Sequence, residues 1–207
     1  MSEEREKIIE RILKEKGESA IPTLIKLLYD EDSNVKEMAA DALFRLGEPA
    51  KEALYEELRR RWREGIEEDD VSILYMVDLL GDFGEKRAKE IFYSLISKYT
   101  VEEAILVIYE ALAKIGEGEK LLKVLEYMLL EDGDRNRFGD QVAMVLAHVN
   151  SPVSVEILIR AFRDEDLNAE VKEFVLQALR ILVGRNPDLV GRVPEDILDE
   201  MGRIEWN

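Results

Sequence analysis

The chain of 207 residues contains no cysteine, which excludes disulfides, thiolate chemistry and zinc sites built on thiolates. Its one histidine, His148, cannot supply the several imidazoles that a histidine-based iron or zinc centre needs. No run of eighteen apolar residues occurs, so we expect no membrane span. Residues 1–18 are charged and amphipathic and lack the apolar core of a signal peptide. These absences predict a cytoplasmic protein without metal ions or other cofactors.

Basic residues are also scarce: 29 Lys and Arg stand against 46 Asp and Glu, a formal net charge of -17. A nucleic-acid partner is therefore not expected, because binding to a phosphate backbone requires clustered cations that displace its counterions. The longest basic cluster, residues 59–63, ends a predicted helix, where cations complement the helix dipole. Glutamine is rare and 36% of the residues are charged, a composition typical of proteins from heat-adapted organisms.

The chain does contain a recurring helix ending, an apolar residue usually followed by glycine and then glutamate after an amphipathic run. The ending recurs at Gly17, Gly47, Gly84, Gly116, Asn150 and Gly184. The intervals are 30 to 37 residues, about 33 on average, which is the period of a helical-hairpin repeat. Such hairpins bury their apolar faces only by stacking, so the period predicts a solenoid whose extended surface binds other macromolecules.

Individual helices follow from apolar spacing and from turn signals. Apolar positions three and four apart predict an amphipathic helix over residues 3–16 and a second helix from Ala20, with Pro22 in its first turn. Ser33 is the predicted cap of the next helix, which ends at Gly47. Further helices are expected near residues 49–63, 69–83, 86–98, 102–115, 119–131, 139–149, 152–163, 168–183 and 194–204, about twelve in all.

The segment from Ala20 to Gly47 resembles a HEAT repeat, particularly the short HEAT-like variety of phycobilisome lyase subunits and of bacterial and archaeal repeat proteins. The residues that carry the resemblance are Pro22, Leu24, Leu27, Leu28, Asp30, Asp32, Val35, Lys36, Ala39, Ala40, Ala42, Leu43 and Gly47. Weaker copies follow at residues 79–84 and 157–182. The resemblance implies an all-α fold, a right-handed α-solenoid of HEAT-like helical hairpins. A tetratricopeptide array has nearly the same period, but its aromatic and small-residue signature does not recur in register.

We therefore expect a single HEAT-like repeat array over residues 1–207. Residues 1–17 are predicted to form an N-terminal capping helix, residues 18–190 about five helix pairs, and residues 191–207 a C-terminal cap. Charge-rich terminal helices would cover the exposed ends of the core, as the end units of a solenoid must.

No stretch carries a convincing catalytic or metal-binding pattern. Asp132, Asp134 and Asn136 alternate as at the start of an EF-hand loop. However, Arg137 stands in place of the turn glycine and Ala143 in place of the closing glutamate, so a polar interhelical loop is expected. HEAT-like metal-dependent hydroxylases need several His-Glu pairs, and HEAT-like alkylpurine DNA glycosylases need a basic groove. Neither activity is expected, and the chain is predicted not to be an enzyme.

In HEAT arrays the second helix of each pair lines the concave wall, so residues of these helices outside the core are the candidate partner-binding set. Aligning the second helices on their terminal glycine positions gives Glu37, Asp41, Arg45, Tyr75, Asp78, Asp82, Glu110, Lys114, Met144, His148 and Gln177. The wall is predicted to be acidic toward its N-terminal half, with Tyr75, Met144 and Phe174 as candidate apolar anchors. One step of register would instead place Tyr75 and Phe174 in the core.

These features predict a non-catalytic scaffold or adaptor that binds a protein, expected to be a basic or amphipathic segment, on an acidic concave face. The alternative is an accessory subunit of a protein-modifying enzyme, lyase-type or chaperone-like, by analogy with the phycobilisome lyase HEAT proteins. A HEAT-like nucleic-acid enzyme is the third candidate, which a basic channel would favour. We expect neither a nucleic acid nor a membrane as partner, and the sequence leaves the oligomeric state open.

Overall fold

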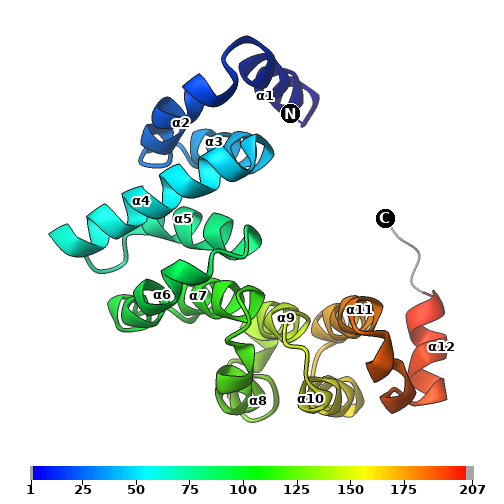
Figure 1. Ribbon diagram of the computed structural model, residues 1–207. Helices are drawn as coiled ribbons and strands as arrows, with labels where there is room; N and C mark the ends of the chain where they lie inside the picture. Colours follow the sequence, from blue (N-terminus) through cyan, green and yellow to red (C-terminus); the bar gives the residue numbers. More distant parts are fainter. Residues whose placement is uncertain (1, 204–207) are drawn as a thin grey trace. The chain divides into compact units, whose positions relative to one another are not determined.

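The computed structural model describes residues 2–203, and this part of the chain is helical, with α-helices, short 3-10 segments and no strand. Its α-helices are α1 (Ser2–Glu15), α2 (Ile21–Leu27), α3 (Ser33–Leu46), α4 (Glu48–Glu64), α5 (Val71–Asp82), α6 (Lys89–Leu95), α7 (Glu102–Lys114), α8 (Leu122–Leu130), α9 (Arg135–Leu146), α10 (Pro152–Arg163), α11 (Ala169–Arg185) and α12 (Glu195–Arg203) (Figure 1). Their order confirms the predicted all-α repeat architecture, whereas the right-handed winding stays a prediction. Over the described residues, no helix combines the length and apolarity needed to cross a bilayer.

Short 3-10 segments interrupt two of the predicted helices. The helix expected over residues 86–98 is split into η2 (Lys86–Ala88), α6 and η3 (Ile96–Lys98). The helix expected from residue 119 starts with η4 (Gly118–Leu121) before α8. In a 3-10 segment a backbone N–H donates to the carbonyl three residues earlier. These segments therefore supply hydrogen-bond partners for backbone groups at the ends of the α-helices. Two further segments, η1 (Gly17–Ala20) and η5 (Pro187–Arg192), connect helices near the termini.

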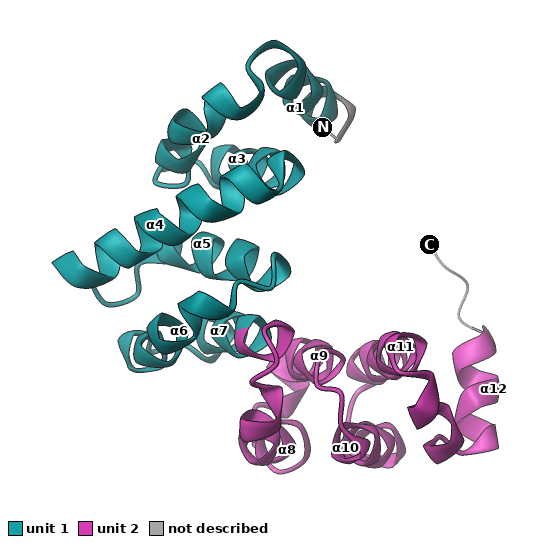
Figure 2. Ribbon diagram, in the orientation of Figure 1, with its two compact units in different colours: residues 1–111 teal, residues 112–207 magenta. Residues whose placement is uncertain are grey.

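The chain forms two compact units, unit 1 (Met1–Ala111) and unit 2 (Leu112–Asn207), and the boundary between them falls inside α7 (Figure 2). A single array over the whole chain stays a prediction. The predicted caps, residues 1–17 and 191–207, contain α1 and α12, while residues 1 and 204–207 lie outside the described residues.

In unit 1 the helices pack in two layers. α2 packs against α3, and α4 packs against α5, as the first and second helices of two hairpins. α1, α3 and α5 pack in sequence as the second-helix layer, and α2 and α4 pack as the first-helix layer. The core between the layers contains Leu24, Leu28, Ala39, Leu43, Leu54, Leu58, Ile73, Met76 and Leu80, all buried. These side chains recur three or four positions apart, so each helix has one apolar face to bury.

Unit 2 has the same arrangement. α8 packs against α9 and α10 against α11, while α9, α11 and α12 form its second-helix layer. Its buried core includes Leu125, Leu129, Phe138, Val142, Leu146, Leu158, Ala161, Val175, Leu179 and Leu182. Each hairpin thus covers the apolar face of its neighbour within the unit, as the repeat period predicts.

The predicted start of the helix at residue 139 is wrong, because α9 begins at Arg135 and Gly139 lies within it. A Cβ atom at Gly139 would lie 2.9 Å from Val171 Cγ1 of α11 and 3.4 Å from Leu129 Cδ1 of α8. Glycine at this position therefore lets α9 approach α11 closely and does not mark a helix boundary.

The recurring glycine identifies helix ends at four of its positions. Gly17, Gly47, Gly84 and Gly116 have φ angles of 52°, 69°, 64° and 95°, in the left-handed region that side chains disfavour. Gly184 is different: the predicted helix end there is wrong, because α11 continues through Gly184 to Arg185.

The cap of α3 predicted from the sequence, Ser33, is wrong, because Asp32 caps the N-terminus of this helix. The Asp32 carboxylate accepts a hydrogen bond from the Asn34 backbone N–H at 2.9 Å, and Ser33 is the first helical residue. This bond and one from the Asn34 side-chain amide lower the pKa of Asp32. Asp70 caps α5 in the same way, accepting from the Ser72 N–H at 2.9 Å. An ionised carboxylate complements the positive end of the helix dipole better than a hydroxyl does.

Candidate partner-binding surface

The candidate residues lie on second helices of both units, except for His148, which follows the end of α9. In unit 1, α3 carries Glu37, Asp41 and Arg45, α5 carries Tyr75, Asp78 and Asp82, and α7 carries Glu110. In unit 2, Lys114 ends α7, Met144 lies on α9, His148 follows α9, and Gln177 lies on α11. None of these side chains is buried, and Tyr75, Phe174 and Met144 are partly exposed and are not core residues. Whether they bind a partner stays a prediction.

Ion pairs join the exposed side of α3 to α1. The Arg5 guanidinium donates to Glu37 Oε2 at 2.9 Å and to Asp41 Oδ2 at 2.6 Å. In the opposite sense, Arg45 of α3 donates to both carboxylate oxygens of Glu6, at 2.5 and 2.8 Å. The hydrogen bonds from Arg45 lower the pKa of Glu6. Neighbouring helices of the second-helix layer are thus paired through alternating charges.

The acids of α3 on the predicted wall are therefore paired with α1, and the acidity of the wall stays a prediction. On α1 and α3 together, the guanidinium groups of Arg5 and Arg45 face three carboxylates and neutralise most of their charge. The sequence pattern gives α1 no register to α3, because α1 is predicted to be a cap. The signal that identifies Arg5 is its distance of about one repeat period from Glu37 and Asp41.

On α5, Tyr75 and the aspartates continue this surface. Tyr75 is half-buried, and its pKa is raised by burial and by the negative charge of Glu37 on the neighbouring helix. Asp78 and Asp82 are exposed on the same helix, four residues apart, although neither is without a partner inside the protein. Glu37 and Asp41 have the same spacing on α3, so α3 and α5 each place two carboxylates on one face.

The single histidine has a definite neighbour in unit 2. His148 Nδ1 lies 2.6 Å from Nη1 of Arg185, and because a guanidinium only donates hydrogen bonds, Nδ1 is the acceptor. No group of three or more His, Cys, Asp or Glu side chains in the described part of the chain could hold a metal ion.

The loop that begins like an EF-hand uses its polar side chains within the protein. Asp132 Oδ1 accepts from the Asp134 N–H at 2.9 Å, which closes a turn. The Asn136 side chain donates to the Asp166 carbonyl at 3.1 Å and accepts from the Asn168 N–H at 2.8 Å. These contacts close the α8–α9 loop with a turn and tie the first turn of α9 to the α10–α11 loop.

Among models of known families, the Armadillo/beta-catenin-like repeat matches residues 17–46. The match supports a HEAT- or Armadillo-like repeat family. It covers η1, α2 and α3, the same hairpin that carries the HEAT-like resemblance, and it does not single out the phycobilisome lyase type. No curated protein and no solved structure matches the chain. Armadillo-like arrays commonly present extended surfaces that bind other proteins. The exposed side of the second-helix layer is the candidate for such a surface in this protein.

Proposed function

We propose that this protein is a non-catalytic, protein-binding scaffold, and that the exposed side of α3 and α5 in unit 1 binds a basic amphipathic helix of a partner. Here this surface is called the α3–α5 face, and it consists of Glu37, Asp41, Tyr75, Asp78 and Asp82. Armadillo-like repeats are typically scaffolds without catalytic activity, which favours binding over catalysis.

The observation that carries the proposal is the binding of Arg5 by α3. Two carboxylates four residues apart, Glu37 and Asp41, hold the guanidinium of a neighbouring amphipathic helix at 2.9 and 2.6 Å. Charge-assisted hydrogen bonds of this kind are stronger than neutral ones and favour arginine. On α5 the same spacing recurs at Asp78 and Asp82, next to the partly exposed ring of Tyr75. A pair of carboxylates with the spacing that binds Arg5 of α1 is therefore also present on α5.

A partner suited to this face is a helix with arginine on one side and leucine or a similar residue beside it. Arginine supplies the donors for the paired carboxylates, and the apolar side chain covers the half-buried ring of Tyr75. A nucleic acid is disfavoured, because the net charge of -17 repels a phosphate backbone. No observation in the described residues favours the lyase-type or chaperone-like alternative.

The test is a fluorescence anisotropy titration with two labelled peptides of matched length. One is a designed amphipathic helix with Leu on one face and Arg on the other, and the second has Glu in place of each Arg. Wild-type protein is expected to bind the Arg peptide more tightly at about 50 mM than at about 300 mM salt, and to bind the Glu peptide weakly.

The decisive variant is Asp78→Lys combined with Asp82→Lys, which reverses the charges on α5. We expect it to weaken binding of the Arg peptide by about tenfold or more. The control is Glu195→Lys with Asp199→Lys, two exposed acids with the same spacing on α12. An equal loss of affinity for the Arg peptide in both variants would mean that only net charge matters, and the assignment of binding to the α3–α5 face would be wrong. Because Asp78 and Asp82 have internal partners, Asp78→Asn with Asp82→Asn is measured as well, and circular dichroism checks folding.

A further inference from the structure

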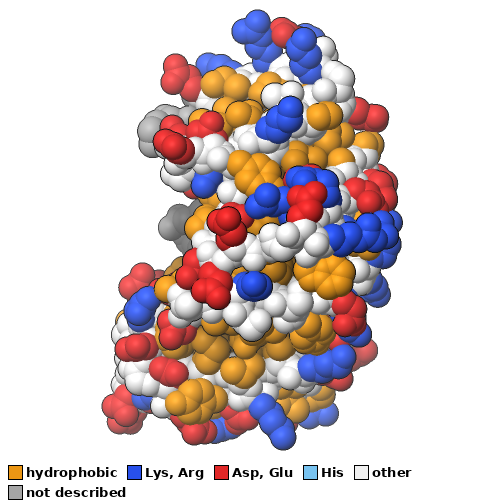
Figure 3. Space-filling model, turned by 90° about the vertical axis from the view of Figure 1, so that its left-hand side faces the viewer, with side chains coloured by type: hydrophobic (Ala, Val, Ile, Leu, Met, Phe, Trp, Pro, Cys, Tyr) orange, Lys and Arg blue, Asp and Glu red, His pale blue; other side chains and the backbone are white. Residues whose placement is uncertain are grey.

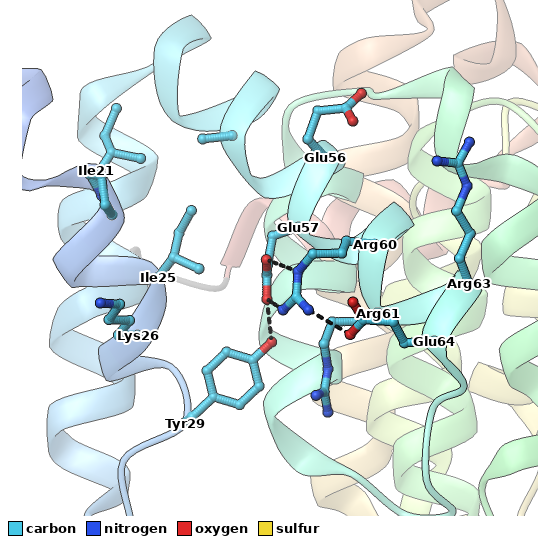
Figure 4. Close-up of a pocket in the computed structure, with 12 residues that line it drawn as sticks. Ile21, Ile25, Lys26, Tyr29, Glu56, Glu57, Arg60, Arg61, Arg63 and Glu64 are labelled. Carbon is cyan, nitrogen blue, oxygen red and sulfur yellow. Dashed lines mark hydrogen bonds and ion pairs between the residues drawn. The ribbon is translucent and has the colours of Figure 1, made fainter.

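An open groove runs between α2 and α4 on the first-helix layer of unit 1, with a volume of about 920 Å³. Figure 3 shows the side of the molecule on which α2 and α4 lie in Figure 1, where cationic and acidic side chains alternate and apolar side chains are exposed between them. Ile21, Pro22 and Ile25 of α2 and Ala53 of α4 supply the apolar part of the groove. Charged side chains of α4 form its other side (Figure 4).

The acids of the groove are already paired inside it. Tyr29 reaches from the end of α2 toward α4, where its hydroxyl donates to Glu57 Oε1 at 3.2 Å (Figure 4). Arg60 donates to both oxygens of Glu57, at 3.0 and 2.7 Å, and to Glu64 at 2.5 Å. Glu56 is paired with Arg59 at 3.1 Å. An incoming ligand therefore meets carboxylates that have cationic partners.

Three cations of the groove are weakly compensated or not compensated at all. Lys26 and Arg63 form no ion pair with any residue of the described part of the chain. Arg61 lies 5.4 Å from the centre of the Tyr29 ring, and its one carboxylate contact is Asp70 at 3.3 Å. Its Nε is buried without a hydrogen-bond acceptor. The groove thus combines an apolar side with two cations, Lys26 and Arg63, that have no ionic partner in the described residues, in a protein whose net charge is strongly negative.

We propose that the α2–α4 groove is a second docking site, which binds an acidic segment of a partner protein. An apolar side chain of that segment packs on Ile21 and Ile25, and its carboxylates pair with Lys26, Arg61 and Arg63 across the groove. Charge complementarity selects an acidic ligand, because each acid of the groove already has a cationic partner and the four cations that line the groove outnumber its three acids. The apolar side selects a peptide over a free phosphate, which has nothing to place against Ile25.

The overall negative charge does not exclude this ligand. Charges more than about 8 Å away are screened at physiological ionic strength, whereas contacts in a partly apolar groove are screened much less. The site is independent of the α3–α5 face: it lies on the other layer of unit 1 and prefers ligands of the opposite charge.

The experiment uses a labelled amphipathic peptide with Leu on one face and Glu on the other, and a matched peptide with Lys in place of Glu. The protein of 207 residues is titrated by fluorescence anisotropy. We expect the Glu peptide to bind, and the variant Lys26→Glu with Arg63→Glu to weaken it by about tenfold or more. Neither residue has an internal partner, so the variant is expected to fold. Ile25→Ser is expected to weaken binding without any change in charge.

The control is Lys14→Glu with Lys123→Glu, two exposed lysines outside the groove with the same change in charge. If both double variants weaken the peptide equally, or if the Glu peptide fails to bind at about 1 mM, the groove proposal is wrong. Loss of Glu-peptide binding in the Asp78→Lys and Asp82→Lys variant alone would also contradict it, since that change lies on α5. Sedimentation tests the remaining occupant: a dimer that Lys26→Glu with Arg63→Glu dissociates would show that a second copy, and not an acidic partner, fills the groove.

Discussion

Gly47 both ends α3 and precedes α4, with φ of 69° and ψ of -137°. Residues with a side chain rarely adopt this conformation, whereas Gly184 lies within α11 and its Cβ would meet nothing within 4 Å. Gly47→Ala is therefore expected to destabilise the protein by about 1–3 kcal/mol. Gly184→Ala is expected to be neutral or to stabilise the protein by up to about 1 kcal/mol, since alanine favours helix.

Urea unfolding of both variants measures the difference between the two effects. Equal effects of the two substitutions would show that the glycine at the α3–α4 junction is not required for its backbone.

Glu85 is a buried carboxylate that caps η2 and binds Arg87. It accepts from the Arg87 N–H at 2.9 Å, from Nε at 2.8 Å and from Nη2 at 2.6 Å. Arg87 also pairs with Glu52 of α4 at 2.6 Å and stacks on Tyr55, 4.3 Å from the ring centre. The side-chain hydrogen bonds from Arg87 lower the pKa of Glu85 below its ordinary value of 4.5, outweighing the opposing effect of burial.

A carboxylate whose pKa is lowered by folding stabilises the protein fully above its unfolded pKa, and this contribution is lost as the pH falls through the folded pKa. We therefore expect wild-type protein to lose more stability than Glu85→Gln as the pH is lowered from about 6 to 3. At pH 7 the Gln variant should be the less stable of the two. Denaturant unfolding across this pH range measures the difference, with Glu90→Gln, an exposed acid of α6, as control. Parallel pH curves for wild type and Glu85→Gln would contradict this role of Glu85.

At the scale of helices, the pairing of α1 with α3 links stability to binding. Arg5 is partly exposed, so its ion pairs with Glu37 and Asp41 are expected to contribute only about 0.5–1 kcal/mol, and less at high salt. Its removal releases two carboxylates on the α3–α5 face. Arg5→Gln is therefore expected to be slightly less stable than wild type, and to bind the Arg peptide about three- to tenfold more tightly.

The matched control is Arg11→Gln on the same helix, where the ion pair of Arg11 with Glu15 stays within α1. Both variants change the net charge equally, so any difference between them reports the release of Glu37 and Asp41. Anisotropy titration at low salt gives the affinities and urea unfolding gives the stabilities. Equal affinities for the two variants would mean that these carboxylates do not bind the peptide.

The sequence predicts helices well where one apolar stripe faces the core. In α2 and α3, Leu24, Leu28, Ala39 and Leu43 are buried, and their spacing alone identifies the hairpin. The start of α9 was not predictable, because the glycine at residue 139 is present for close packing against α11. Single-sequence patterns contain no information on how closely two helices approach.

The candidate site was predictable only in part. Exposure of the second-helix residues follows from register, and none of the candidate side chains is buried. The partners of these side chains do not follow from register: Arg5 binds Glu37 and Asp41 across more than thirty residues of sequence. The α2–α4 groove has no sequence signal at all, because it depends on the space left between two helices whose residues are individually ordinary.

At the scale of the whole molecule, the net charge of -17 acts together with the local surfaces. A negative field raises the rate at which cationic ligands arrive, and this effect falls with ionic strength. A higher association rate alone does not determine where on the surface the ligand binds, however. A basic helix that is merely attracted by net charge would contact many acidic side chains, whereas one recognised by the α3–α5 face would contact α3 and α5.

The measurement that tests this claim most directly is an NMR titration of ¹⁵N-labelled protein with the unlabelled Arg peptide, followed through backbone amide shifts. Our account predicts that the largest shifts cluster on α3 and α5, near Glu37, Tyr75 and Asp78, and that they diminish at high salt. Shifts spread evenly over the acidic surface, or confined to unit 2 while α3 and α5 stay unchanged, would contradict it.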